Sequence, residues 1–371
     1  MMSARFLTVV LERAFNMRDG FGREIDYMRI SVIDSCNLNC YYCNPCDNNE
    51  HCHALNILSV KEVLCIVRAA TRLGIKHFRL TGGEPLLHPQ LDEMVLQIKK
   101  IPGVSSVSLT TNAVLLVQHA KWLKEAGIDS INVSLDTIDA SEYERITKKP
   151  LLEEVKHGIN AAIKCGIRVK INVVLTPQTD VVALTRYVAK KGTDIRFIEM
   201  MPVGEGHTNG VEPYKKVIGT LSKLYGEPCR INTEKTKEIN SGNDKRKIPD
   251  NGPAEYYIFP ELDIRVGLIQ AIHGKFCDTC NRIRVTADGR LMPCLGSSVT
   301  MDLVPDSWDF ADDVEKDFAI VRALRAAIKA KPRCHNFNDN AVTYTKTTET
   351  KTTEIEAAEV NAARNMSRIG G

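Results

Sequence analysis

The chain alternates between short apolar runs and longer segments in which apolar residues recur every three or four positions. The short runs are rich in branched residues, as strands are, and they span residues 28–33, 77–81, 104–111, 130–135, 168–175 and 194–201. The longer segments have the spacing of helices that bury one face, and they span residues 60–74, 91–101, 119–127, 151–166 and 181–192. Four of them end in a glycine that can cap a helix, at Gly74, Gly127, Gly166 and Gly192. Strands that alternate with helices predict an α/β fold with a parallel sheet.

Six strand-then-helix units in a row predict a partial (β/α)6 barrel of the TIM type, which we assign to residues 1–225. In such a barrel the chemistry lies on the loops that follow the carboxyl ends of the strands. The pattern changes after this point, so residues 226–371 are predicted to form a C-terminal region. There we expect a polar loop, a hairpin attached to the sheet, a helix and a Thr-rich segment of low complexity, at residues 232–252, 254–272, 314–329 and 343–356.

The composition is that of an ordinary globular protein. The chain has 371 residues, of which 43% are hydrophobic and 26% charged, and this length suits one large domain or two. A net charge of +3 is too small to indicate nucleic acid as a partner. Because we find neither an apolar run of membrane-spanning length nor a secretory signal, we expect no membrane association and a cytoplasmic location. In that reducing compartment the twelve cysteines favour metal binding over disulfides, although Cys65 and Cys165 fit the apolar faces of helices.

Three cysteines follow the first predicted strand within eight residues: Cys36, Cys40 and Cys43. A compact trio is a poor match to a structural zinc site, which usually closes with four ligands in separated pairs. Thiolates suit iron-sulfur clusters, and three of them on a four-iron cluster leave one iron open. The spacing therefore predicts a [4Fe-4S] cluster with a vacant iron, on a loop where barrel chemistry is expected.

With Tyr42 before its last cysteine, the trio resembles the signature of the radical S-adenosylmethionine (radical SAM) enzymes. In that family the open iron binds the amino and carboxylate groups of SAM, and an electron from the cluster splits SAM into methionine and a 5'-deoxyadenosyl radical. The sequence "GGEP" after the second predicted strand is a weak motif alone, but it resembles the family's motif for the amino group of SAM. The resemblance implies that SAM contacts Tyr42, Gly82, Gly83, Glu84, Ser134 and Met201.

A second trio lies far along the chain, at Cys277, Cys280 and Cys294. Three thiolates here could bind another cluster with an open iron, now facing a substrate. Alternatively, Cys334 could complete a zinc site. The spacing alone leaves both possibilities open.

The second trio contains "CNRIR", and with the first trio it resembles the GTP 3',8-cyclase family of molybdenum cofactor biosynthesis. The resemblance runs from about Gly22 to Cys294 and resumes at the C-terminus. It implies two [4Fe-4S] clusters, SAM as cofactor and GTP as substrate. The radical would remove the ribose 3' hydrogen, and the carbon radical would attack C8 of guanine. It also implies a homodimer and transfer of the product to a cyclic pyranopterin monophosphate synthase. It does not identify the protein that donates electrons to the clusters.

Cationic side chains at predicted strand positions suit a triphosphate. Arginine can hold phosphate oxygens in pairs with its planar guanidinium. A single arginine within a predicted strand could be a surface charge or a partner in a structural ion pair. Several arginines within neighbouring strands instead favour a common anion-binding site. The resemblance implies GTP contacts by Arg29, Arg79, Thr110, Lys170, Arg196, Arg282 and Arg284. It further implies catalytic roles for the Arg282 and Arg284 pair and for a double-glycine tail, Gly370 and Gly371, that reaches back into the active site.

Three residues depart from the family pattern, namely Asn44, His77 and Ala113. The family commonly has lysine at the position of His77. Histidine carries less positive charge than lysine at neutral pH, so a contact from this position to a phosphate of GTP would be weaker. Cys46 and Cys52 lie with two histidines after the first trio and fit a variable surface loop better than a metal site. The Thr-rich segment lengthens the connection to the tail.

Two other functions fit part of the pattern. One is another radical SAM enzyme with an auxiliary cluster, such as a peptide-modifying maturase, which would need neither the Arg282 and Arg284 pair nor the double-glycine tail. The other is a non-catalytic metal-binding or redox-sensing protein, which would not cleave SAM under reduction.

Overall fold

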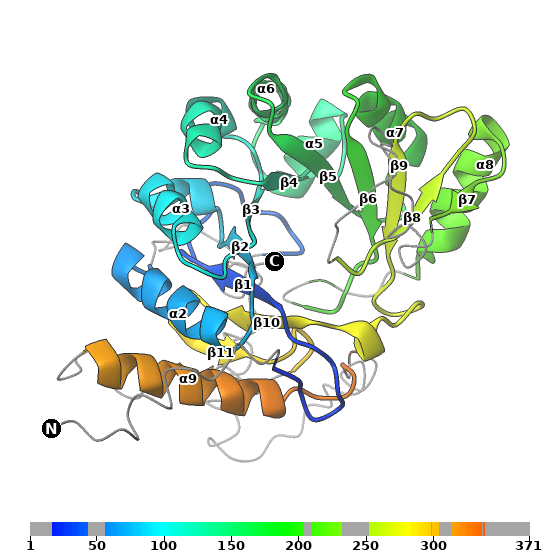
Figure 1. Ribbon diagram of the computed structural model, residues 1–371. Coiled ribbons are helices and arrows are strands. Elements are labelled where there is room, and N and C mark those ends of the chain that lie inside the picture. Colours follow the sequence, from blue (N-terminus) through cyan, green and yellow to red (C-terminus); the bar gives the residue numbers. More distant parts are fainter. Residues whose placement is uncertain are drawn as a thin grey trace, which may run out of the picture.

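The structure is a computed structural model that describes residues 17–43, 56–203, 206, 210–231, 252–297, 299–303, 313–335 and 337. Its strands belong to one sheet whose order is β12-β11-β10-β1-β2-β3-β4-β5-β6-β9-β8-β7, so the two edges do not meet and the barrel is open (Figure 1). The predicted strands are β1 (Tyr27–Ser31), β2 (His77–Thr81), β3 (Ser106–Thr111), β4 (Ser130–Ser134), β5 (Arg168–Val174) and β6 (Asp194–Ile198). These six strands run parallel in chain order, as predicted for a partial (β/α)6 barrel.

The C-terminal region adds strands to both edges of this sheet. At one edge, β9 (Arg265–Ile269) pairs with β6, and β8 (Glu255–Ile258) and β7 (Cys229–Arg230) follow it in antiparallel pairs. The β8–β9 pair confirms the predicted hairpin. At the other edge, β10 (Arg282–Val285) pairs in parallel with β1, and β11 (Arg290–Met292) and β12 (Met301–Asp302) follow it. Two segments about 250 residues apart in sequence, β1 and β10, thus lie side by side.

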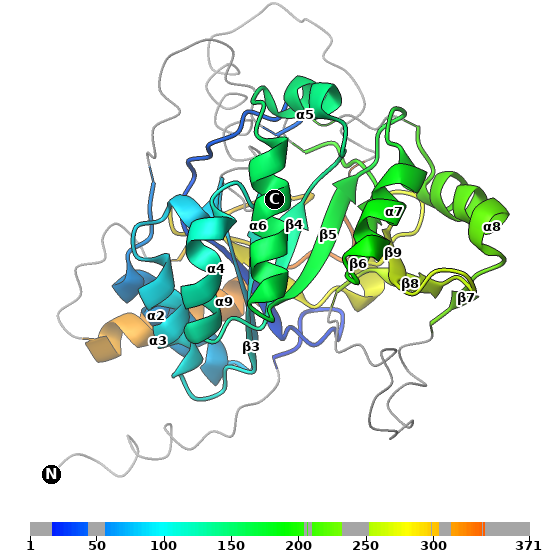
Figure 2. The same cartoon turned by 90° about the horizontal axis from the view of Figure 1, so that it is seen from above.

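Helices cover the outer side of the parallel strands (Figure 2). The α-helices of the described residues are α2 (Val60–Arg72), α3 (Leu91–Lys99), α4 (Leu116–Glu125), α5 (Ala140–Thr147), α6 (Leu152–Lys164), α7 (Val181–Lys190), α8 (Gly219–Tyr225) and α9 (Asp313–Lys329). The four glycines predicted to end helices all have positive φ, as a C-cap requires. Helix α9 packs against α2 and against β11 and β12, so it covers the edge that carries the second trio. No helix in the described part of the chain is long and apolar enough to cross a membrane.

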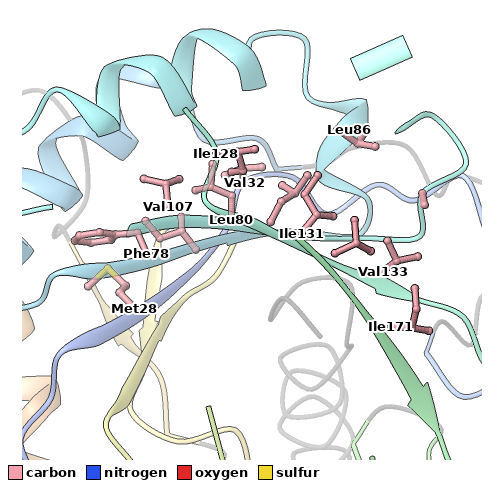
Figure 3. Packing of buried hydrophobic residues seen from close by; sticks show 14 of the residues in the cluster. Met28, Val32, Phe78, Leu80, Leu86, Val107, Ile128, Ile131, Val133 and Ile171 are labelled. Carbon is pink, nitrogen blue, oxygen red and sulfur yellow. The ribbon is translucent and has the colours of Figure 1, made fainter. Parts of the chain in front are cut away.

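The strands alternate between an apolar face and a polar face. On β1 and β2, Met28, Ile30, Phe78 and Leu80 are fully buried in the core that faces the helices (Figure 3). The residues between them, such as Arg29 and Arg79, point the other way because successive strand side chains alternate. Parallel strands are usually apolar on both faces. Here the inner face carries charge instead, and this makes the concave side of the sheet suitable for a polar ligand.

Candidate active site

The concave side of the sheet contains a cavity of about 310 Å³. Both cysteine trios line it, although more than half of the chain separates them in sequence. The structure also brings most of the predicted ligand contacts to this wall, namely Arg29, Tyr42, Arg79, Gly82, Gly83, Glu84, Thr110, Ser134, Arg196, Met201, Arg282 and Arg284.

A few predicted positions are not in this wall. Lys170 is buried in β5 and does not line the cavity, although Asn172, two residues further along the same face, does. His77 is held by a hydrogen bond between its Nδ1 and Ser106 Oγ, at 2.8 Å. Gly370 and Gly371, Asn44, Cys46, Cys52 and the Thr-rich segment lie outside the described residues.

The loop of the first trio packs directly against the "GGEP" loop. The amide of Gly83 donates to the carbonyl of Ile33 and that of Glu84 to the carbonyl of Ser35, each at 2.7 Å. A Cβ added to Gly82 would lie 2.4 Å from the Ile33 carbonyl oxygen, and one added to Gly83 would lie 2.2 Å from that of Ser35. Both glycines line the cavity, as expected of SAM contacts, and their backbone also lies against that of the preceding loop. Their immediate role is to let the two loops touch.

Glu84 lines the cavity, and three hydrogen-bond donors hold its carboxylate in place. Its carboxylate accepts hydrogen bonds from the amide of Leu86 at 3.0 Å, the hydroxyl of Thr111 at 2.7 Å and the amide of Asn112 at 2.7 Å. Burial raises the pKa of Glu84 to about 7. A carboxylate has about four acceptor positions, so one remains for a further donor such as an ammonium group.

Three half-buried thiols, those of Cys36, Cys40 and Cys43, line the same corner of the cavity. Cys36 Sγ accepts a hydrogen bond from the amide of Leu38 at 3.5 Å, and Asn112 Nδ2 donates to the same sulfur at 3.8 Å. Burial raises the pKa of the Cys36 thiol to about 11 and that of Cys43 to about 12. Thiols with such pKa values keep their protons at neutral pH until a bound metal displaces them. Three thiols that line one part of the cavity are the donors that an iron-sulfur cluster takes, so the donor set fits the predicted cluster.

Tyr42 is anchored by a residue that the sequence reading missed. Its hydroxyl donates to Asp136 Oδ2, and Asp136 Oδ1 accepts from the amide of Val174 at 2.8 Å. Burial raises the pKa of Asp136 to about 6. The pair ties the first-trio loop to the carboxyl ends of β4 and β5. The signal was an acidic residue two positions after the strand, in "VSLD".

The arginines gather around Tyr27, a second residue that was missed. The guanidinium carbons of Arg79 and Arg282 lie 5.9 Å and 5.7 Å from the centre of its ring, and Arg79 Nε donates to its hydroxyl. Arg79 Nη1 also donates to Thr110 Oγ1 at 3.4 Å. Burial and the neighbouring Arg282 lower the pKa of Arg284 to about 10. Cations that destabilise each other in this way would gain free energy from a bound polyanion.

The second trio lies on the β10–β11 side of the cavity. Lys331, also missed, donates from Nζ to the carbonyls of Arg282 at 2.8 Å and Pro293 at 2.9 Å. Burial acts to raise the pKa of the Cys280 thiol, but Lys331 and Arg282 outweigh it and the pKa is lowered. Cys334, which could have completed a zinc site, is exposed and does not line the cavity. Among the described residues, no three or more His, Cys, Asp and Glu side chains have the spacing of a site for a single metal ion.

Comparison with known proteins agrees with this geometry. Residues 30–183 match the family model of the radical SAM superfamily, and residues 193–337 match that of Molybdenum Cofactor Synthesis C. A GTP 3',8-cyclase from Clostridium perfringens (strain SM101 / Type A) is 35% identical over 324 residues, which cover 86% of this chain and 95% of that protein. A GTP 3',8-cyclase from Peptoclostridium acidaminophilum is 37% identical over 328 residues, which cover 86% and 94%.

Solved structures show the same fold. Streptococcus suis SuiB bound to S-adenosylmethionine has a TM-score of 0.53 at 15% identity, with 81% of this chain and 65% of that chain covered. Native anSMEcpe with bound AdoMet has a TM-score of 0.51 at 17% identity, with 82% and 84% covered. The solved structures show only the fold, whereas the sequence relatives are similar enough, over nearly their whole length, to show the family. The chain belongs to the GTP 3',8-cyclase family of radical SAM enzymes.

Proposed function

We propose that the protein converts GTP to 3',8-cyclo-7,8-dihydro-GTP, the first step of molybdenum cofactor biosynthesis. One observation carries this proposal: both cysteine trios and the arginines Arg29, Arg79, Arg282 and Arg284 line one cavity. This arrangement would place a radical source, a second metal centre and a polyanion site around one space, where all three could act on the same molecule. The relatives named GTP 3',8-cyclase support the choice of GTP.

The first-trio corner would hold a [4Fe-4S] cluster on Cys36, Cys40 and Cys43. When bound, this cluster and SAM supply the 5'-deoxyadenosyl radical that removes the 3' hydrogen of GTP. Glu84 offers its remaining acceptor position to the amino group of SAM, and the three donors around its carboxylate hold it in place. Gly82, Gly83, Ser134 and Met201 complete the SAM wall.

The arginines hold the triphosphate and orient the nucleotide. Guanidinium groups from β1, β2, β6 and β10 come together from different strands, which fixes a flexible triphosphate in one position. Most of the rate enhancement from the protein would come from this placement, since well-oriented reacting groups gain about 7–11 kcal/mol. Arg282 and Arg284 lie closest in sequence to the second trio and are proposed to act on the reacting nucleotide.

The second trio is proposed to hold another [4Fe-4S] cluster that faces GTP. Ligands of a single ion converge on one point, whereas the cysteines of a cluster each bind a different iron. Cys277, Cys280 and Cys294 line the cavity, whereas Cys334, the candidate fourth ligand of a zinc site, is exposed and does not line it, which supports a cluster over zinc. By family resemblance, we further propose that Lys170 contributes to the GTP site, that Gly370 and Gly371 enter the active site, and that the product passes to a cyclic pyranopterin monophosphate synthase. A homodimer is proposed on the same basis.

Anaerobic incubation of the reconstituted protein with SAM, dithionite and GTP tests the proposal. Mass analysis should find a cyclised nucleotide together with 5'-deoxyadenosine. Cleavage of SAM with GTP unchanged would instead favour a peptide-modifying enzyme. No cleavage of SAM by protein that contains both clusters would point to a non-catalytic metal protein.

A further inference from the structure

Asn132 places an unsatisfied polar atom in the wall of the cavity. The residue lies in β4 and is only 5% exposed. Its Oδ1 is buried and has no hydrogen-bond partner among the described residues. A buried acceptor without a partner is costly, and folded proteins keep few of them. An acceptor of this kind in a cavity wall is suited to a donor on a bound ligand.

The orientation of the side chain follows from its neighbours in the strand. Ile131 and Val133 are fully buried in the apolar core on the helix side of the sheet (Figure 3). Successive strand side chains point to opposite faces, so Asn132 faces the cavity, which it lines. The amide therefore points at the ligand space and not into the core.

The register of the sheet places Asn132 between the residues proposed to bind SAM and the residues proposed to bind GTP. It pairs with Thr110 of β3, which Arg79 contacts, and it lies two residues before Ser134 in the SAM wall. Asn172 of β5 also lines the cavity, but its Oδ1 already accepts a hydrogen bond from Arg196 Nε at 2.9 Å. Asn132 thus has an acceptor available where SAM and GTP would meet.

The chemistry of the nucleotide narrows the donor. Phosphate oxygens only accept hydrogen bonds, so they cannot pair with Oδ1. The proposed reaction, on which this inference rests, brings the ribose of GTP next to SAM. We propose that Asn132 accepts a hydrogen bond from a ribose hydroxyl of the bound nucleotide and thereby selects GTP over its deoxy analogues. The ribose of SAM offers the same chemistry, but the pairing of Asn132 with Thr110 favours the ribose of GTP.

Equilibrium dialysis on the reconstituted holoenzyme, without reductant, tests this contact. The probes are GTP, 2'-deoxy-GTP, 3'-deoxy-GTP and, separately, SAM. We expect the wild type to bind GTP about tenfold more tightly than the analogue that lacks the contacted hydroxyl. Asn132→Leu removes the acceptor and should bind that analogue and GTP equally, whereas Asn132→Asp keeps an acceptor oxygen and should retain a preference for GTP.

Thr185→Val is the matched control, because Thr185 Oγ1 in α7 is also buried with no hydrogen-bond partner in the described part of the chain but does not line the cavity. This variant should keep the wild-type preference. Equal binding of GTP and both analogues by the wild type would overturn the inference without need of any variant. Loss of SAM binding but not of GTP binding in Asn132→Leu would overturn the assignment to GTP. A wild type that binds no GTP would instead refute the proposed function.

Discussion

At the scale of single residues, burial sets the protonation of the groups that would meet SAM. Glu84 has a pKa raised to about 7, so it is partly protonated at neutral pH when no cation is nearby. Its charged form is the one that attracts an ammonium group. The folded state binds this proton more readily than the unfolded state does, so ionisation of Glu84 lowers the stability of the fold as pH rises through 7. Bound SAM would offset that loss.

We therefore predict that SAM binds more weakly at low pH. Glu84 is mostly protonated one pH unit below its pKa, so affinity should fall about tenfold from pH 8 to pH 6. Dissociation constants of SAM measured across this range on the cluster-loaded protein check this. Glu84→Gln should bind SAM weakly and with a flat pH profile. A wild-type profile as flat as that of the variant would contradict the assignment.

The arginines next to the second trio give a second prediction at this scale. Replacing Arg282 and Arg284 together by alanine should abolish the cyclised product and weaken GTP binding by at least about tenfold, because hydrogen bonds to charged groups are lost. SAM cleavage uncoupled from product should remain detectable. Arg230→Ala is the control, since this arginine is 63% exposed and pairs with Glu255 away from the cavity. Undiminished product from the double variant would remove both arginines from the mechanism.

At the scale of elements, the contact between two loops determines whether the first trio can form. Gly83 lies against the carbonyl of Ser35, one residue before the trio begins. Gly219 provides a contrast, because it opens α8 with nothing within 4 Å of an added Cβ. Comparison of alanine at the two positions therefore separates steric exclusion from the general cost of losing a glycine.

We predict that Gly83→Ala destabilises the fold by about 1–3 kcal/mol, as overpacking does, and prevents full cluster incorporation. Gly219→Ala should be neutral or slightly stabilising, because alanine favours a helix over glycine. Thermal unfolding and the iron content after reconstitution measure both effects. If Gly83→Ala retained wild-type iron content and stability, the close contact would have no consequence for the site.

Some elements escaped prediction for physical reasons. Helix α5 has eight residues and few apolar positions, and it depends on Asp139, whose side chain caps the amide of Glu142 at 2.8 Å. Helix α8 has only seven residues and follows a π-helical turn at Tyr214–Ile218. Ala113, which departs from the family pattern, has a φ of 65°, so it takes up the left-handed conformation that glycine adopts most readily.

At the scale of the molecule, Arg23 joins the N-terminal part of the chain to the second-trio region. The buried guanidinium donates to the carbonyls of Cys277 at 2.7 Å, Arg333 at 2.8 Å and Pro332 at 2.6 Å. It also forms a buried ion pair with Asp19. One side chain thus satisfies a local carboxylate and carbonyls that lie more than 250 residues away in sequence.

Arg23→Met should destabilise the fold by about 3–5 kcal/mol, since Asp19 and the carbonyls would lose their partner while buried. We expect spectroscopy to show loss of the second cluster before the first. Arg72→Met is the control because Arg72 is 54% exposed in its pair with Asp317, and such pairs contribute about 0–1 kcal/mol. Equal effects of the two substitutions would show that Arg23 is not a connecting residue.

The sequence by itself determined the local features of this protein. Periodicity located the strands, the covering helices and their glycine caps, because these depend on neighbouring residues. The spacing of Cys36, Cys40 and Cys43 indicated an iron-sulfur site, since three thiolates on one loop need little else to define them. Arginines at strand positions indicated that one face of the sheet is polar.

Only the tertiary structure decided which of these features share one space. The pairing of β10 with β1 brings the second trio to the same cavity as the first, and no local pattern encodes that pairing. Lys170 was predicted as a GTP contact but does not line the cavity. Asn132, Asp136 and Lys331 line the cavity although the sequence did not indicate them. The reason is geometric: strand alternation gives the face, but register and sheet curvature set the depth at which each side chain meets the cavity.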